Sequence, residues 1–192
     1  MGSSALSVFG VVININSFVQ SCSYSVGQSA QPIISTNLGA NRGDRIKKTL
    51  KYALWTVAVF SAFWVILSMA VPNLYIRIFM SPTPEVLAIA PAIIRCYAIS
   101  FLLLPLNIFS TYYFQTLMKP QIAFAISVSR GLVISGILIF LLPVIAGADA
   151  IWFAMPITEV LVCIFVILMM IRYTKRLPIQ GKTIQQPQPE TQ

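Results

Sequence analysis

The sequence has little charge. Of its 192 residues only 9 % are Asp, Glu, Lys or Arg, whereas 57 % are hydrophobic. A soluble domain has about 25 % charged residues, so a chain of this composition could not keep its surface in water as a monomer. The apolar excess also excludes a disordered chain, except at the C-terminus. Together with a mean hydropathy of +0.82, the composition indicates an integral membrane protein.

Histidine is absent and cysteine is scarce. Without His the chain lacks the commonest zinc ligand and the commonest general base. Cys22, Cys96 and Cys163 have no paired spacing, which excludes a disulfide scaffold, and are most simply small apolar fillers within helices. The sequence therefore predicts no enzyme, no metal site and no cofactor.

Five apolar stretches of the sequence carry no more than one charge each. A membrane-spanning helix needs about 20 mostly apolar residues, so we expect an all-α membrane fold. A buried soluble bundle is the alternative, which the low charge disfavours. Pro32 and Pro105 are the expected kinks, and residues 177–192, rich in Gln and Pro, predict a disordered cytoplasmic tail. The predicted helices cover roughly residues 5–38, 46–71, 86–117, 121–146 and 150–172.

The basic residues gather at one side of the predicted membrane. Because cytoplasmic loops are enriched in Lys and Arg, we expect the N-terminus outside and the C-terminus in the cytoplasm. The positive charge then sets orientation and contacts anionic lipid. No basic stripe is interleaved with aromatics on a soluble face, so nucleic acid is not an expected partner. Of the 13 basic residues, all but Arg77 and Arg95 lie on the expected cytoplasmic side.

The first predicted span is polar over more than half of its surface. At about 100° per residue, Asn16, Gln20 and Gln31 share one face. Hydrocarbon does not solvate amides and hydroxyls, so this flank faces either other helices, through interhelical hydrogen bonds, or a substrate cavity. Its weak hydrophobicity also predicts that the chain is cut from a longer one. A further polar row lies beside the first and consists of Asn14, Ser17, Ser21, Ser25 and Gln28.

The third span carries a second polar arc, in which Asn107, Thr111 and Gln115 follow Ser100. These side chains either line a cavity or pack against the two spans that follow. Aromatic residues beside them offer cation–π faces to an organic cation. We therefore treat Asn107, Thr111 and Gln115 as cavity candidates together with the amides of the first span.

Glu159 is the one carboxylate well inside a predicted span. An intramembrane carboxylate is costly unless it is paired or protonated, which makes it a functional candidate. It either exchanges a proton against a cationic substrate or forms a structural ion pair with Arg130 or Arg95. Both interpretations stay open at the level of sequence.

Several collinear segments resemble multidrug and toxic compound extrusion (MATE) transporters, most closely the MepA-like branch. Gly27–Asn41, which reads GQSAQPIISTNLGAN, resembles the end of that family's eighth helix. Later segments resemble the following external loop, the tenth helix and its turn, the start of the eleventh helix, and the turn into the twelfth. They are Pro72–Phe79, Arg95–Tyr97, Tyr113–Gln115, Lys119–Pro120, Ser129–Gly131, Gly147–Trp152 and Pro156–Glu159.

The resemblance implies two six-helix lobes around a cavity that opens alternately to each side. This chain would be helices eight to twelve, an incomplete second lobe over residues 1–176. It implies antiport of organic cations against Na⁺ or H⁺ in a bacterial plasma membrane, conferring antibiotic resistance, with the missing N-terminal lobe as partner. Some members carry an acidic residue in helix ten, and residues 86–117 have none, so that cation site is not predicted. The chain alone is then not expected to transport.

Two other functions are alternatives to export. The first is a lipid-linked saccharide flippase of the same superfamily, which would need a more cationic cavity to bind pyrophosphate. The predicted spans contain only two arginines, Arg95 and Arg130, which argues against it. A non-transporting membrane remnant or scaffold is the second alternative.

Overall fold

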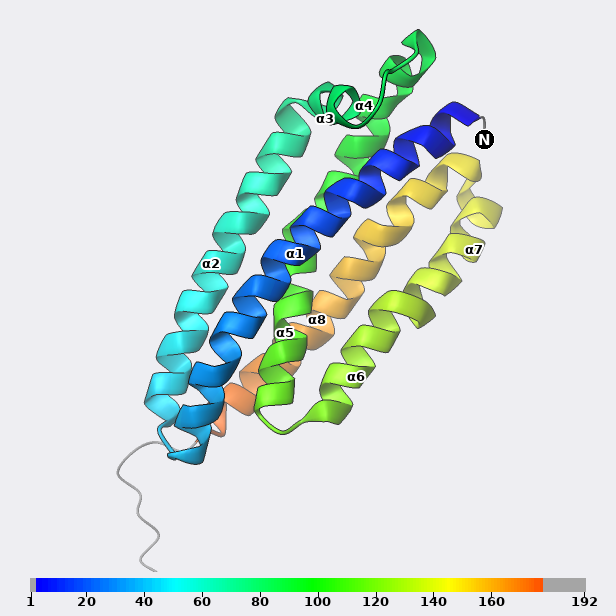
Figure 1. Cartoon of the computed structure of the whole chain (residues 1–192). Coiled ribbons are helices and arrows are strands. Elements are labelled where there is room, and N and C mark those ends of the chain that lie inside the picture. Colours follow the sequence, from blue (N-terminus) through cyan, green and yellow to red (C-terminus); the bar gives the residue numbers. More distant parts are fainter. Residues whose placement is uncertain (1–2, 178–192) are drawn as a thin grey trace, which may run out of the picture.

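In the computed structural model, which describes residues 3–177, long helices lie side by side and run back and forth (Figure 1). No strand occurs in this part of the chain. Short turns join the helices at both ends of the bundle. The α-helices are α1 (Ser3–Gly39), α2 (Gly43–Ala70), α3 (Pro72–Phe79), α4 (Pro84–Ala98), α5 (Leu104–Thr116), α6 (Pro120–Val128), α7 (Ile134–Ala146) and α8 (Ala154–Lys175).

Five segments are long and apolar enough to cross a membrane, which confirms the predicted fold class. The shortest has 27 residues, or about 40 Å at 1.5 Å per residue, against a hydrocarbon core of roughly 30 Å. Residues 178–192, most of the predicted tail, lie outside the described residues, while Leu177 is buried in the bundle. The five spans are Ser4–Gly39, Gly43–Ala70, Pro84–Thr116, Pro120–Ala146 and Ala148–Lys175.

Two of these spans are not α-helical throughout. In the third, the 3₁₀ turn η1 (Ile99–Leu102) separates α4 from α5, because the ring nitrogen of Pro105 cannot donate to the carbonyl one turn earlier. In the fourth, the π-helical turn η2 (Ser129–Val133) separates α6 from α7. The sequence did not predict η2. The first span continues as an α-helix through Pro32.

Two clusters of buried side chains fill the bundle. One joins the first half of α1 to α3 and α4 and includes Ile15, Ile76 and Phe101. The other joins the second half of α1 to α2, α5 and α8 and includes Phe109 and Val166. In both, apolar side chains at helical spacing face the neighbouring helices, which is why the chain packs as a bundle.

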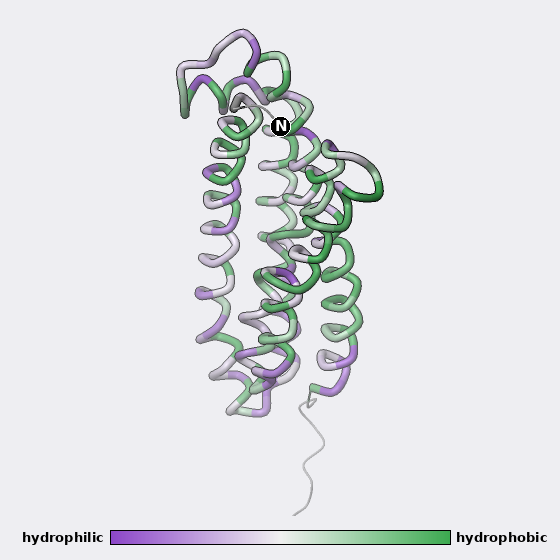
Figure 2. Tube along the Cα trace, turned by 90° about the vertical axis from the view of Figure 1, so that its right-hand side faces the viewer, coloured by the Kyte–Doolittle hydropathy of each residue, from purple (hydrophilic) through white to green (hydrophobic). Residues whose placement is uncertain are grey.

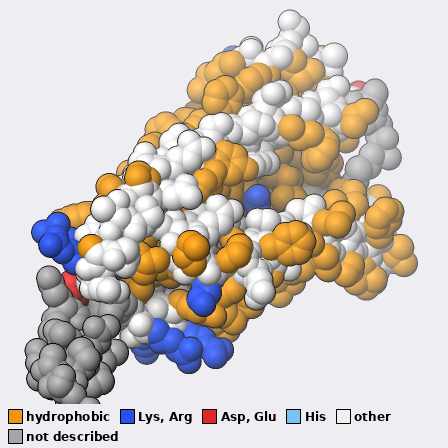
Figure 3. Space-filling model, turned by 60° about the horizontal axis from the view of Figure 1, so that its bottom comes forward, with side chains coloured by type: hydrophobic (Ala, Val, Ile, Leu, Met, Phe, Trp, Pro, Cys, Tyr) orange, Lys and Arg blue, Asp and Glu red, His pale blue; other side chains and the backbone are white. Residues whose placement is uncertain are grey.

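The outer surface of the bundle suits lipid. On α7, the large side chains of Phe140, Val144 and Ile145 are exposed. In Figure 2, which is turned so that the α6–α7 side of Figure 1 faces the viewer, the tube there is mostly coloured as hydrophobic. The basic side chains gather at the end of the bundle that comes forward in Figure 3. There the α1–α2 and α5–α6 turns meet the end of α8. Of the basic residues grouped from the sequence, Arg130 is not part of this end but lies within the fourth span, and Lys182 lies outside the described residues.

One glycine lets two helices approach closely. A Cβ atom built at Gly27 of α1 would lie 2.5 Å from Cδ2 of Tyr112 on α5, which is closer than real carbon contacts. The absence of a side chain at Gly27 therefore sets the spacing between α1 and α5.

Candidate functional site

A row of polar side chains runs along the exposed face of α1. Ser17, Ser21 and Ser25 each donate their hydroxyl proton to the backbone carbonyl one turn earlier, at 2.9 to 3.0 Å. Asn14 donates to the carbonyl of Gly10 at 3.1 Å. These bonds satisfy the donors within α1 itself, while the oxygen lone pairs stay available to water or a ligand. We call Asn14, Ser17, Ser21, Ser25 and Gln28, all of them exposed, the open row.

The amides chosen from the sequence lie on the neighbouring flank, nearer to α5. Asn16, Gln20 and Gln31 are half-buried, and Gly27, on the same flank, packs against Tyr112 of α5. The side-chain carbonyl of Gln20 accepts a hydrogen bond from the Tyr24 hydroxyl at 3.0 Å. The open row has the same spacing of three and four residues in the sequence, and its greater exposure became apparent only in the structure.

The polar arc of the third span is divided by the fold. Asn107 is fully buried, Thr111 is half-buried and Gln115 is exposed. The Thr111 hydroxyl donates to the carbonyl of Ile108 at 2.7 Å. Asn107 instead points toward α8, so these three candidates do not form one wall.

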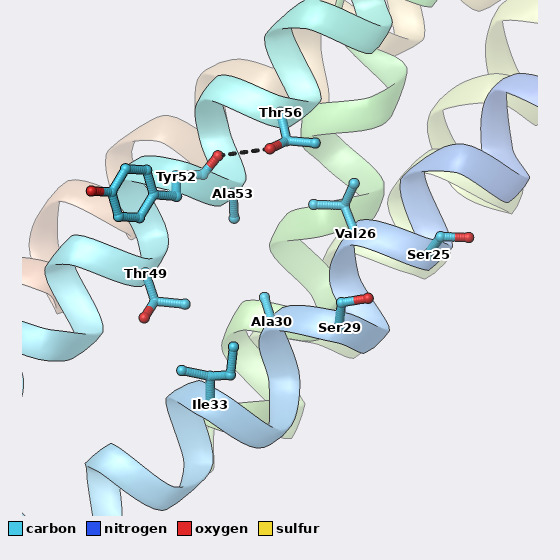
Figure 4. A pocket seen from close by; sticks show the side chains of 9 residues that line it. All are labelled: Ser25, Val26, Ser29, Ala30, Ile33, Thr49, Tyr52, Ala53 and Thr56. Atoms are coloured by element: carbon cyan, nitrogen blue, oxygen red, sulfur yellow. Dashed lines mark hydrogen bonds between the residues drawn. The ribbon is translucent and has the colours of Figure 1, made fainter.

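A shallow groove of about 400 Å³ lies between α1 and α2, and the sequence did not predict it. Hydroxyl groups stand on both of its walls, as Figure 4 shows for Ser25, Ser29 and Thr56. Thr56 donates its hydroxyl to the carbonyl of Tyr52 at 3.0 Å. Because Ser25 belongs to both features, the groove extends the open row toward α2. The lining consists of Ser25, Val26, Ser29, Ala30, Ile33, Thr49, Tyr52, Ala53 and Thr56.

A separate polar cluster lies inside the bundle, around Glu159 of α8. The Nδ2 atom of Asn107 donates to the Glu159 carboxylate at 2.6 Å and to its backbone carbonyl at 3.0 Å. Nη1 of Arg130, in η2, lies 3.5 Å from the other carboxylate oxygen. The side chain of Glu159 is 0 % exposed and that of Arg130 is 18 % exposed. Three separate spans therefore meet at one carboxylate.

Arg95 takes no part in this cluster. Its side chain is exposed, and its Nε donates to the backbone carbonyl of Met69 in α2 at 3.3 Å. The sequence left Arg130 and Arg95 open as ion-pair partners of Glu159, and in the structure the partner is Arg130. Among the described residues, no group of three or more His, Cys, Asp or Glu side chains could hold a metal ion.

Five helices of membrane-spanning length define the fold as that of a multi-pass helical membrane protein. The family model MatE matches residues 1–141, and the chain belongs to this family of multidrug efflux transporters. Its members are transporters rather than enzymes, in keeping with the sparse catalytic groups of the sequence.

The relatives agree with this assignment. "Probable multidrug resistance protein YoeA" of Bacillus subtilis (strain 168) is 28% identical over 102 residues, which are 53% of this chain and 22% of that protein. A solved MATE multidrug transporter, DinF-BH, superposes with a TM-score of 0.77 at 29% identity, and the match covers 86% of this chain and 37% of that one.

A second solved structure shares the fold. An outward-facing multidrug resistance MATE family transporter of the MOP superfamily has a TM-score of 0.83 at 13% identity, and the match covers 92% of this chain and 40% of that one. The chain thus spans about a fifth of the curated relative and about two fifths of the solved transporters.

Proposed function

We propose that this chain is part of a secondary active efflux transporter that exports organic cations by alternating access, in exchange for Na⁺ or H⁺. The open row of α1 carries this proposal. Its amide and hydroxyl groups are exposed along a helix of membrane-spanning length, and hydrocarbon does not solvate such groups. The row therefore borders a watery pathway.

In this proposal the chain is the C-terminal portion of the transporter, helices eight to twelve of a MepA-like protein. The covered share of the solved transporters, 40% and 37%, is what five of twelve helices would give. The open row and the α1–α2 groove would then face the cavity between this lobe and the N-terminal lobe, and five spans alone would not transport. The basic end of the bundle faces the cytoplasm of a bacterial plasma membrane, with the N-terminus outside.

The side chains along this surface suit an organic cation. Tyr24 and Tyr112 lie edge to face, with ring centroids 6.2 Å apart, and aromatic rings of this kind attract cations. Neither the open row nor the groove lining contains a basic residue. Arg130, one of the two intramembrane arginines, is engaged by Glu159, which disfavours a pyrophosphate-binding flippase.

The test is efflux of a fluorescent lipophilic cation from cells that express the whole reading frame containing this chain. Ser21→Leu places an apolar side chain in the open row, and we expect a fall in efflux rate of about tenfold, roughly 1.4 kcal/mol. Ala58→Leu adds the same side chain on an exposed position of α2 and serves as the matched control.

If both variants export the cation as fast as the parent protein, the transport pathway does not run along the α1 surface. Absence of gradient-driven efflux of any cation from the parent itself, at normal expression, would favour a membrane scaffold.

A further inference from the structure

The cluster around Glu159 contains one buried atom without a partner. The donor side of the Asn107 amide is fully used, because Nδ2 bonds both the carboxylate and the backbone carbonyl of Glu159. The acceptor side is not, because Oδ1 is buried and has no hydrogen-bond partner. Asn107 is 0 % exposed. A buried acceptor without a donor is unfavourable, so the ionised cluster is missing one proton donor.

We infer that Glu159 is a proton-binding site of this lobe, in which Asn107 serves as a reversible partner and Arg130 as a releasable counter-cation. In the ionised state the carboxylate accepts hydrogen bonds from Asn107 and Arg130. In the protonated state a proton taken from solution forms an O–H bond on Glu159. The acid then donates to Oδ1 of Asn107 after the amide group turns over. No other covalent bond forms or breaks. The turnover gives up both hydrogen bonds from Nδ2 to Glu159, and the net charge of the cluster rises from zero to +1.

The donors around Glu159 favour a proton over a metal cation. Both carboxylate oxygens already face N–H groups, one from Asn107 and one from Arg130. Na⁺ would need oxygen ligands in their place and would stand beside a guanidinium. The inference thus rests on the proposed antiport and names H⁺ as its coupling ion at this site.

Within residues 3–177, the uncharged titratable side chains beside the carboxylate are Tyr97 of α4 and Cys163 of α8. Arg130 from η2 is the charged neighbour, and Asn107 of α5 is neutral. Protonation of Glu159 would therefore leave Arg130 without a counter-charge.

Arg130 is the member of the cluster that connects it to the fourth span. It lies in the π-helical turn η2, and its side chain reaches the surface whereas those of Glu159 and Asn107 do not. Single π-helical turns inside α-helices occur often at functional sites, because the extra residue can be taken up or released. Loss of the ion pair would loosen this turn.

The experiment uses the whole chain in lipid nanodiscs and reads Glu159 without altering the cluster. The sequence has three glutamates, Glu85, Glu159 and Glu190. Glu85→Gln with Glu190→Gln leaves Glu159 as the single ¹³C-labelled glutamate carboxyl. Its ¹³Cδ resonance is followed from about pH 4 to about pH 9. We expect one titration, and we expect the protection of the amides of residues 129–133, relative to their intrinsic exchange rate at each pH, to fall at least about tenfold in the protonated form.

Two further samples separate a proton site from a fixed ion pair. Glu159→Gln should show low amide protection at residues 129–133 at every pH, and so should Arg130→Gln, because each lacks the pair that responds to the proton. The Glu85→Gln, Glu190→Gln background is the matched control and should keep the pH dependence.

A ¹³Cδ resonance that stays at its carboxylate position throughout would overturn the inference and identify a permanent structural ion pair. This result needs no transport, and so it would leave the export proposal standing. Conversely, Glu159 could titrate as expected while the protein exports no cation. That result would contradict the proposed function and leave the proton-binding site standing.

Discussion

Asn107 and Gln115 lie about two turns apart on α5, yet the fold places them in opposite surroundings. Asn107 is fully buried and bonds Glu159, whereas Gln115 is exposed. Their spacing in the sequence predicts that Asn107 and Gln115 lie on the same side of an α-helix. The course of α8, whose Glu159 lies against Asn107, decides that the first of them points into the bundle.

We therefore expect Asn107→Ala to destabilise the protein by about 1–3 kcal/mol, because it removes the donor to a buried carboxylate. Gln115→Ala on the same helix should change stability by less than about 0.5 kcal/mol. Denaturant unfolding in detergent micelles, followed by Trp fluorescence, measures both. Similar losses for the two variants would contradict the buried role of Asn107.

The two intramembrane arginines give a second contrast between single residues. Arg130→Gln leaves Glu159 buried without a cation and should cost about 3 kcal/mol. Arg95→Gln removes an exposed side chain that bonds one backbone carbonyl, and we expect a change within about 1 kcal/mol. The same unfolding measurement tests them, and a larger loss at Arg95 would show that it carries the structural pair instead.

At the scale of helices, the contact of α1 with α5 depends on Gly27. In Gly27→Ala the new methyl group overlaps the Tyr112 ring, so the helices must separate, at a cost of about 1–3 kcal/mol. Gly10→Ala adds the same methyl group to the same helix where nothing lies within 4 Å.

Because Ala has the higher helix propensity, Gly10→Ala should be neutral or stabilising by up to about 1 kcal/mol. Thermal unfolding of both variants in micelles gives the comparison. Equal stability of Gly27→Ala and the parent chain would mean that Tyr112 moves aside freely.

The interruptions of the third and fourth spans also belong to this scale. Pro105 marks the first in the sequence, because proline cannot donate within a helix. No proline marks η2, which reads Ser-Arg-Gly-Leu-Val. Its Ser and Gly are residue types found at kinks, but they do not by themselves specify a π turn. The ion pair of Arg130 with Glu159 explains why an irregular turn persists there.

For the whole molecule, the distribution of charge predicts the orientation in the membrane. A cysteine placed by Lys47→Cys should react with a membrane-impermeant thiol reagent only from the cytoplasmic side. One placed by Ser81→Cys, between α3 and α4, should react only from outside. The background needs Cys22, Cys96 and Cys163 replaced by Ala.

Labelling of intact cells and of inverted vesicles distinguishes the two sides. Reaction of both cysteines in intact cells, or the reverse pattern, would contradict the proposed orientation. The proposed role of the polar surface of α1 would stand in either case. That role depends on the exposure of its side chains and not on which end of the helix faces the cytoplasm.

Hydropathy is a local property, and so the sequence by itself determined the five spans, the polar character of α1 and the resemblance to transporters. The transfer free energy of each segment into lipid needs no knowledge of its neighbours. The ion-pair partner of Glu159, the exposure of the open row and the α1–α2 groove became known only from the tertiary structure. Each depends on how one helix is rotated against another, and one extra residue in a π turn rotates all that follows by about 100°.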